Sequence, residues 1–311
     1  MRAYGWFGLL VLLVSEYFLL RRTEPFYSWF YSLAWWAFIL IADSLLLRLR
    51  SRSLLTMRRS ELRLMLPLSV FIWLLFEAYN LVIKNWAYEG VPSQLWIRWP
   101  GYALAFSTVL PGIFITSDII ETLLFGRRTG PAASEAEFAD GTGPEKHSAP
   151  IFLAGLFLSA APLIWPRFFF PAVWVGPIFL LHPLLRRVGL QGLSLSAATG
   201  RWTRPWSLMA AGLVCGGLWE FWNYWAGSRW GYSVPFFDSW KLFEMPILGF
   251  LGFPPFAVEC WILYYLLTAL RRRMGRAAVL LWIILAVVSI LMFRAIDRET
   301  VLRYAAPMAG H

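Results

Sequence analysis

Nine long apolar segments limit what this chain can fold into more than any other feature of its sequence. A helix needs about 20 mostly apolar residues to cross the hydrocarbon core of a bilayer, which is about 30 Å thick. Segments near that length cover residues 4–20, 26–47, 64–83, 101–125, 150–165, 168–185, 206–226, 246–270 and 277–293. The chain is 59% hydrophobic and only 15% charged, unlike a soluble domain. We predict an all-α, polytopic integral membrane protein with about nine transmembrane helices.

Basic residues between the segments predict the orientation. Arginines cluster in the loops after segments 26–47, 101–125, 168–185 and 246–270, which share one side if every segment crosses once. That side should be the cytoplasm. We predict a multi-pass protein of the cell membrane with the N-terminus in the cytoplasm and the C-terminus outside. The net charge of +10 comes mainly from arginines, which lie at the ends of the apolar segments, where they can contact lipid phosphates. We therefore predict membrane lipids, and no nucleic acid, as partners.

Two stretches of the chain repeat one polar pattern inside apolar sequence. "WLLFEAYNLVIKNWAYEGVP" covers residues 73–92, and "GGLWEFWNYWAGSRWGYSVP" covers residues 216–235. Glu220 follows Glu77 by 143 positions, and Asn223 follows Asn80 by the same 143. Because each half holds four segments, an even number, both copies should point the same way. The pattern predicts two parallel four-helix repeats plus one C-terminal helix.

A polar linker separates the two predicted repeats. Gly, Pro, Ala and Ser dominate the sequence "RRTGPAASEAEFADGTGPEKHSAP", which shows no apolar periodicity. The predicted parts are a first repeat at 1–126, a flexible cytoplasmic linker at 127–149, a second repeat at 150–273, and an extra transmembrane helix with a tail at 274–311.

Several acids and amides lie inside the apolar segments. A spacing of three residues puts Glu77 with Asn80, and Glu220 with Asn223, on one face of a helix. Ionised carboxylates at the bilayer centre are costly, so such residues face the bundle interior and are either paired or protonated. Only His182 offers a cationic group at similar depth. One interpretation is structural, with Glu and Asn hydrogen-bonded between helices. The other is a buried acidic site.

Helix-breaking residues occur at matching places in the two repeats. Pro111 with Gly112 interrupts one segment, and Pro254 with Pro255 interrupts its counterpart just before Glu259. Carbonyl groups freed by such breaks need partners within the protein or in a cavity. Broken helices at equivalent positions of two repeats favour a binding site near the membrane midplane, although a packing kink remains an alternative.

The acidic site has two sets of candidate residues. The candidate catalytic residues are Glu77, Glu121, Glu220 and Glu259. The candidate substrate-binding residues are Asp43, Asn80, His182, Trp222, Asn223 and Trp230. Di-iron helix bundles use Glu-x-x-His where this chain has Glu-x-x-Asn, so no metal site is predicted and the cofactor stays open.

Part of the second repeat resembles the repeated membrane domain of integral-membrane lycopene cyclases. The matching residues are Trp222 with Asn223, Trp230 with Gly231 and Tyr232, Leu242 with Phe243, and Pro246. The resemblance covers residues 222–257 and implies a membrane fold that handles carotenoids or isoprenoids. The family's presumed catalytic Glu-Glu pair is replaced by Leu248 and Gly249, and the four-helix repeat departs from the family's shorter unit. Cyclase activity itself is therefore not implied.

The leading functional prediction is a membrane enzyme acting on a long apolar lipid or isoprenoid, as in carotenoid biosynthesis. Glu77 and Glu220, protonated in a medium of low dielectric, would act as general acids, oriented by Asn80 and Asn223. Aromatic walls would stabilise cationic character. The alternatives are a small-solute or proton-coupled transporter or channel, and a non-catalytic subunit of a membrane complex. The sequence leaves the oligomeric state open.

Overall fold

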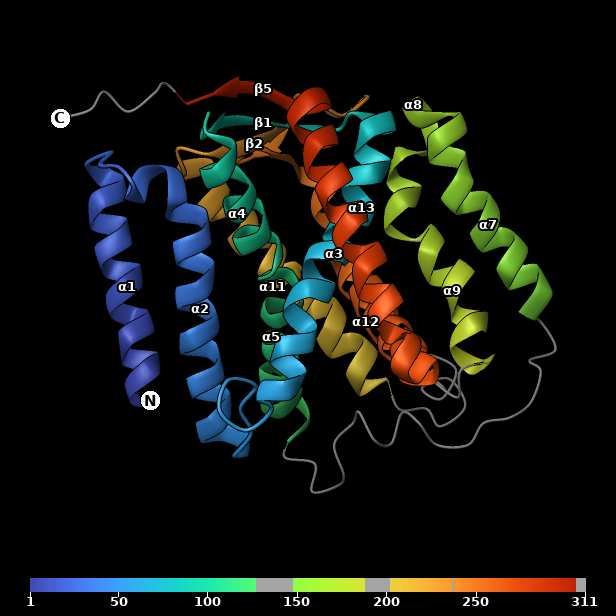
Figure 1. Cartoon of the computed structure of the whole chain (residues 1–311), viewed down its shortest axis with the longest axis horizontal. Helices are drawn as coiled ribbons and strands as arrows, with labels where there is room; N and C mark the ends of the chain where they lie inside the picture. The colour runs from blue at the N-terminus through green and yellow to red at the C-terminus, as the bar shows by residue number, and fades with distance from the viewer. Residues whose placement is uncertain (127–147, 188–201, 237, 306–311) are drawn as a thin grey trace.

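Helices make up most of the fold. The computed structural model describes residues 1–126, 148–187, 202–236 and 238–305. The helices in the first range are α1 (Ala3–Leu20), α2 (Phe26–Arg50), α3 (Arg59–Ile83), α4 (Leu95–Phe106) and α5 (Val109–Phe125). Those in the later ranges are α7 (Ser148–Ile164), α8 (Pro166–Phe169), η1 (Phe170–Trp174), α9 (Gly176–Arg187), α11 (Thr203–Trp225), η2 (Ile247–Gly252), α12 (Phe253–Met274), η3 (Gly275–Ala277) and α13 (Ala278–Glu299). Figure 1 shows them gathered into one bundle.

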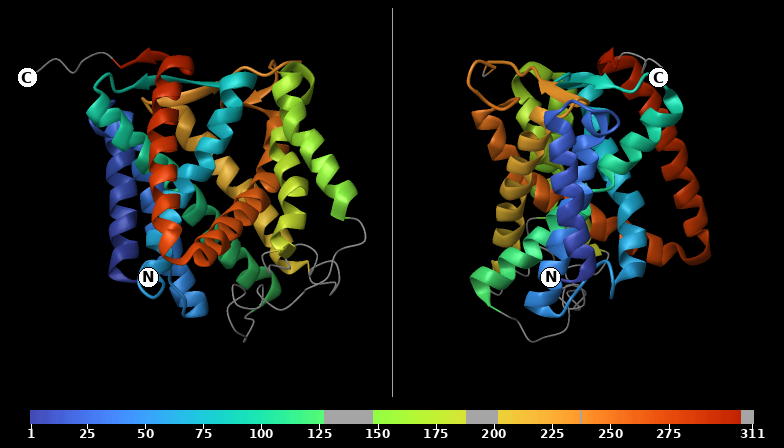
Figure 2. Two further views of the ribbon diagram at one scale, coloured as in Figure 1. Left: turned by 45° about the vertical axis from the view of Figure 1, so that its right-hand side comes forward. Right: turned by 90° about the vertical axis from the view of Figure 1, so that its left-hand side faces the viewer.

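The apolar helices indicate a membrane-embedded protein. Among the described residues, five helical runs are long and apolar enough to cross a membrane, or six if the bent pair Pro166–Trp174 and Gly176–Leu185 forms one span. One of the five runs, Ile247–Glu299, contains both α12 and α13. Figure 2 shows these two helices meeting at the end of the bundle where α1 begins and separating toward the other end. The count of nine transmembrane helices stays a prediction.

Two of the long apolar segments are interrupted. Segment 101–125 forms α4 and α5, which are separated by Ser107 and Thr108. Segment 246–270 begins as the 3-10 helix η2 and continues as α12. Pro111 lies in the first turn of α5, and Pro254 lies in the first turn of α12. Proline fits there because the first turn has no internal partner for its missing N–H. Both interruptions lie just before the prolines and not at them, and the correspondence between the two repeats stays a prediction.

Small β-sheets, absent from the all-α prediction, lie at one end of the bundle. The strands are β1 (Trp86–Val91), β2 (Arg229–Tyr232), β3 (Lys241–Leu242), β4 (Met245–Pro246) and β5 (Val301–Tyr304). Strands β2, β1 and β5 form one sheet in that order, and β3 pairs with β4 in a second. Figure 1 shows the three-stranded sheet lying across the ends of the helices, at the opposite end from the beginning of α1.

The pairing of β1 with β2 is symmetric. The strands run antiparallel, with Trp86 opposite Tyr232 and Tyr88 opposite Trp230. Trp230 follows Trp86 by 144 positions, and Tyr232 follows Tyr88 by 144. A two-fold axis that passes between Ala87 and Gly231 therefore relates the two strands, and places each residue of β1 on the residue 144 positions later in β2. The remaining strand, β5, pairs with β1 in parallel and has no such counterpart.

Aromatic side chains fill the centre of the bundle. Trp35 on α2 is fully buried, and its ring centroid lies 5.5 Å from that of Trp219 on α11. Trp219 contacts Phe256, which in turn contacts Phe76 on α3, and the rings of Phe76 and Trp174 in η1 stack at 5.3 Å. Burying rings of this size supplies much of the apolar area that stabilises a fold. These contacts fix α3 and α11, the helices that carry the repeated Glu and Asn residues.

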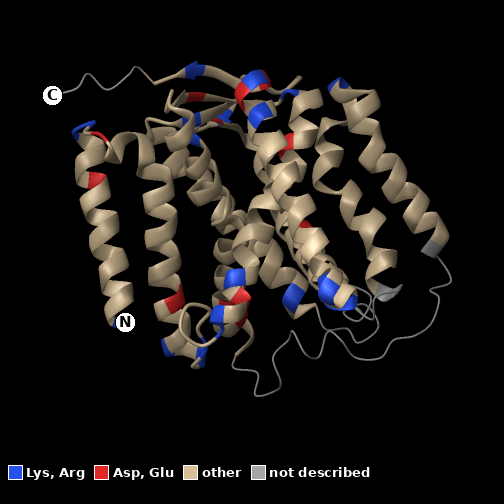
Figure 3. Cartoon of the chain, viewed as in Figure 1, with Lys and Arg blue, Asp and Glu red and all other residues tan. Residues whose placement is uncertain are grey.

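Charged residues gather at the two ends of the bundle (Figure 3). At the end opposite the sheet, Arg271, Arg272 and Arg273 close α12, and Arg48 and Arg50 close α2. The helix surfaces between the two ends carry few charges, as expected for surfaces in contact with lipid. The direction in which the protein crosses the membrane stays a prediction.

Candidate functional site

The repeated asparagines fasten the strands of the sheet to the helices. Asn80 Nδ2 donates to the carbonyl oxygen of Trp86 at 2.7 Å, and its Oδ1 accepts from the backbone N–H groups of Asn85 and Trp86 at 2.9 and 3.1 Å. Asn223 repeats the arrangement, donating to the carbonyl of Trp230 at 2.7 Å and accepting from its N–H at 2.8 Å. Both amides are fully buried. Their recorded partners are backbone groups, which differs from the predicted role of orienting the glutamates.

The Glu77 carboxyl is surrounded by hydrogen-bond donors. Its Oε1 accepts from the indole N–H groups of Trp73 and Trp86, each at 3.0 Å, and from the Tyr88 hydroxyl at 2.5 Å. Oε2 has no partner among the described residues. Burial raises the pKa of Tyr88 well above its usual value, and the neighbouring Glu77 raises it further. This tyrosine therefore remains a neutral donor near pH 7. The carboxyl links α3 to β1.

The Glu220 carboxyl has fewer donors. Its Oε1 accepts from the Tyr232 hydroxyl at 3.0 Å, as Glu77 does from Tyr88, and Oε2 again has no described partner. The counterpart of Trp73, 143 residues later, is Gly216, which has no side chain to donate. Trp230 Nε1 lies near Glu220 and Tyr232 without forming a hydrogen bond of normal geometry, whereas its counterpart on Trp86 bonds to Glu77 at 3.0 Å. The two copies of the site are therefore unequal.

A cavity of about 510 Å³ lies beside Glu220. It is bounded by residues of α2, α3, α4, α5, α8, α11, α12, β1, β2, β4, η1 and η2, and its wall is mainly apolar. The tryptophans in the wall are Trp29, Trp73, Trp86, Trp174, Trp219 and Trp230. Glu220 is one of the lining residues, but Glu77 is not. The volume is in the range of about 300 to 1,000 Å³ that is typical of small-molecule sites.

One edge of the cavity is apolar and exposed. Phe168 on α8, Phe236, and Leu248 and Leu251 in η2 all line the cavity and are 67%, 59%, 53% and 70% exposed. The rings of Phe168 and Phe236 stack at 6.0 Å. Large exposed apolar side chains beside a cavity mark a contact with lipid or with an apolar ligand. The cavity is therefore accessible from an apolar side of the bundle.

The other candidate acids lie away from this cavity. Asp43 accepts from Tyr4, Ser53 and the backbone N–H of Leu54, at 2.6 to 2.9 Å, so it holds the loop after α2. Glu259 is 1% exposed on α12, and its Oε2 has no described partner. Neither residue lines the cavity.

Asp118 and Glu121 have cationic partners. Arg204 NH1 lies 2.7 Å from Asp118 Oδ1 and 3.4 Å from Glu121 Oε2, and Arg50 NH2 lies 3.6 Å from Glu121 Oε1. The expectation that only His182 offers a cation near the acids is wrong for this pair. Long arginine side chains at helix ends can reach inward along apolar surface. The cluster lies where α2 and α5 end and α11 begins.

The last two candidates also lie outside the cavity wall. His182 lies on α9 and is half-buried, and it does not line the cavity. Trp222 is 5% exposed and packs edge-on against Trp35, with centroids 5.2 Å apart. Trp222 therefore belongs to the core, whereas Trp230 lines the cavity.

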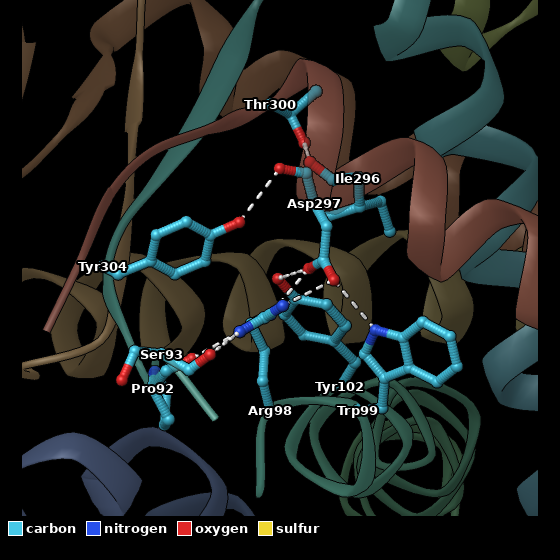
Figure 4. Close-up of polar contacts among 9 residues, drawn as sticks. All are labelled: Pro92, Ser93, Arg98, Trp99, Tyr102, Ile296, Asp297, Thr300 and Tyr304. Carbon is cyan, nitrogen blue, oxygen red and sulfur yellow. Dashed lines mark hydrogen bonds and ion pairs between the residues drawn. The ribbon is translucent and has the colours of Figure 1, made fainter. Parts of the chain in front are cut away.

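Sequence analysis missed a buried ion pair that joins α13 to α4 (Figure 4). Arg98 binds both carboxylate oxygens of Asp297, each at 2.7 Å, and Trp99 and Tyr102 donate to the same carboxylate at 2.9 and 3.0 Å. Arg98 also donates to the carbonyls of Pro92 and Ser93. Arg98 and Asp297 each lie at the end of a predicted transmembrane segment, on the same predicted side of the membrane. This placement of opposite charges could have indicated the pair.

The described residues contain no group of three His, Cys, Asp or Glu side chains that could hold a metal ion. Comparisons with known protein families, curated proteins and solved structures give no match for this chain. Its function therefore has to be argued from the site.

Proposed function

We propose that this protein is a membrane enzyme that binds an apolar lipid or isoprenoid in the cavity and acts on it by general-acid catalysis through Glu220. The observation that carries the proposal is the Glu220 carboxyl in the cavity wall, buried and with Oε2 lacking a described hydrogen-bond partner. No described lysine or arginine is recorded in an ion pair with it. A buried carboxyl with no cationic partner is favoured in its neutral form, which has a proton to give.

The neighbours of Glu220 suit this role. In the proposed step, Oε2 transfers its proton to the substrate, while the Tyr232 hydroxyl, already bonded to Oε1 at 3.0 Å, stabilises the resulting carboxylate. Burial raises the pKa of Tyr232 well above its usual value, so this hydroxyl keeps its own proton. Positive charge that develops on the substrate would be stabilised by the faces of the surrounding tryptophan rings.

Glu77 has a structural role in this proposal. Trp73, Trp86 and Tyr88 occupy one of its oxygens, and the carboxyl lies outside the cavity lining. We therefore assign proton transfer to only one of the two predicted general acids.

The proposal includes an arrangement in the membrane. It retains two parallel four-helix repeats, nine crossings, a cytoplasmic N-terminus and an external C-terminus. The symmetric pairing of β1 with β2 and the matching breaks before α5 and α12 support the repeats. The exposed apolar edge near α8 and η2 supports lateral entry of a ligand from lipid. A transport function has less support, since Asp118 and Glu121 are already paired with arginines.

The test compares Glu220→Gln with Glu77→Gln in cells that make the protein. Gln keeps the size and hydrogen bonds of Glu but has no acidic proton to transfer. Lipids that co-purify in mild detergent would be extracted and identified by mass spectrometry. We expect a specific apolar molecule in the wild type, its precursor in Glu220→Gln, and the wild-type pattern in Glu77→Gln. Bulk phospholipid alone in all three samples would refute the proposal.

A further inference from the structure

The cavity contains polar groups that a pure hydrocarbon would leave without partners. Trp219, Glu220 and Trp230 all line it, and each has one buried polar atom that no described residue bonds: Nε1, Oε2 and Nε1. Trp219 and Glu220 are adjacent on α11. Trp230 lies on the same face of β2 as Tyr232, since residues two apart in a strand share a face, and Tyr232 bonds to Glu220. Glu220 and the indole of Trp230 are therefore neighbours, and Trp219 lines the same cavity.

The chemistry of these atoms selects a ligand group. An indole N–H can only donate, and a neutral carboxyl can both donate and accept. A ligand oxygen that accepts hydrogen bonds would satisfy them, and a hydroxyl would also donate in return. Leaving such groups buried without partners is unfavourable, so an oxygenated ligand should bind more tightly than a hydrocarbon of equal length.

The cations in the cavity wall are already engaged. Arg98 is held by both oxygens of Asp297. Arg229 NH1 lies 3.5 Å from Glu244 Oε1 and donates to the Tyr224 carbonyl at 3.4 Å. A phosphate or carboxylate head group would bring its own charge into an apolar wall whose described residues include no spare cation to balance it, which is costly. The wall therefore favours an uncharged head group.

The cavity of about 510 Å³ is large enough for a long-chain ligand. We infer that the ligand is an uncharged, oxygenated long-chain molecule, such as a long-chain or prenyl alcohol, aldehyde or ketone, whose oxygen binds Glu220 and the indole N–H groups of Trp219 and Trp230. This inference rests on the proposed function, because it names the substrate class of the same site.

The test uses three probes with the same chain: hexadecan-1-ol, hexadecane and hexadecyl phosphate. Delipidated full-length protein would be equilibrated with micelles holding equal amounts of each, separated by gel filtration, and analysed for bound probe by mass spectrometry. The first variant, Glu220→Met, removes the carboxyl and keeps a side chain of similar size. The second, Trp230→Phe, removes the indole N–H, so that the inference can still be tested if Glu220→Met does not fold. Trp206→Phe is the matched control, since Trp206 is 59% exposed on α11 and does not line the cavity.

We expect the wild type to bind hexadecan-1-ol at least about tenfold better than hexadecane, as one buried hydrogen bond predicts. That preference should fall about tenfold in Glu220→Met and in Trp230→Phe, with hexadecane binding unchanged, and should persist in Trp206→Phe. Equal binding of hexadecane, or tightest binding of hexadecyl phosphate, would overturn the ligand class and leave the proposed enzyme intact. Failure of all three probes, together with unchanged lipids in Glu220→Gln, would overturn both.

Discussion

Replacement of Asp297 with leucine is expected to weaken the attachment of α13 to the bundle. The Asp297 carboxylate accepts four hydrogen bonds, two from Arg98 and one each from Trp99 and Tyr102. The Arg98 side chain is only 7% exposed, and that of Asp297 is 14% exposed. In Asp297→Leu the guanidinium keeps its two carbonyl partners but loses its counter-charge (Figure 4).

The expected cost follows from this burial. Removing one partner of a fully buried ion pair lowers the free energy of unfolding by about 3 to 5 kcal/mol. Because Arg98 and Asp297 are slightly exposed, we expect Asp297→Leu to lower it by about 3 kcal/mol. Arg98→Met should cost a similar amount, because it leaves the carboxylate without its cation. The double variant should cost about 2 to 3 kcal/mol less than the sum of the single variants, since neither charge is then left alone.

The assay is unfolding in mixed micelles with increasing SDS, followed by tryptophan fluorescence, with hydrogen exchange to locate the loosened segment. Exchange should rise in α13 and β5 before it rises in α3. Arg303→Met is the control: Arg303 pairs with Glu89 at 3.1 Å, its side chain is 74% exposed, and such pairs contribute about 1 kcal/mol or less. Costs below about 1 kcal/mol for both single variants, or strictly additive costs, would refute the reasoning.

Two further predictions concern the attachment of the strands. Asn80→Ala removes three hydrogen bonds to the backbone and should lower the free energy of unfolding by about 3 kcal/mol, against about 2 kcal/mol for the two bonds lost in Asn223→Ala. Faster amide exchange confined to Asn85 and Trp86 in the first variant and to Trp230 in the second is the expected signature, and unchanged protection would contradict it. The second prediction is alkaline instability: the pKa of Tyr88 is raised by burial, so its contribution to stability is complete below about pH 10 and is lost as pH rises beyond that value. Tyr88→Phe should unfold with a shallower dependence on pH than the wild type above pH 10, and equal slopes would show that the phenol does not titrate differently on unfolding.

The helices and their breaks could be predicted from local sequence because each depends on nearby residues. The apolar length of α2 and the prolines at the beginning of α5 and α12 are visible in short windows of sequence. The sheet could not be predicted in this way. Trp86–Val91 and Arg229–Tyr232 are far apart in the chain, and each is too short to signal a strand alone.

The site could be predicted in part. The repeated spacing identified Glu220 and Asn223 as a functional or structural pair, but it could not say which partner each would find. Asn223 binds backbone, and Glu220 reaches a cavity. Glu121 was grouped with the site because it lies in an apolar segment, and only the fold shows that Arg50 and Arg204 approach it.

The difference between the two glutamates is the strongest argument that one of them has a function beyond packing. A buried carboxyl serves a structural purpose when donors saturate it, as Trp73, Trp86 and Tyr88 do around one oxygen of Glu77. At the second copy, Gly216 replaces the first of these donors, and the indole N–H of Trp230 lies near Glu220 without forming a hydrogen bond of normal geometry. A carboxyl kept in an apolar wall with so few partners lowers stability, and an apolar residue there would be better for folding alone. The cost is explained if the free oxygen of Glu220 is needed for a molecule that enters the cavity. The same logic requires that Glu220→Met destabilise the protein less than Glu77→Met, since the first leaves one bonded donor without its acceptor and the second leaves three.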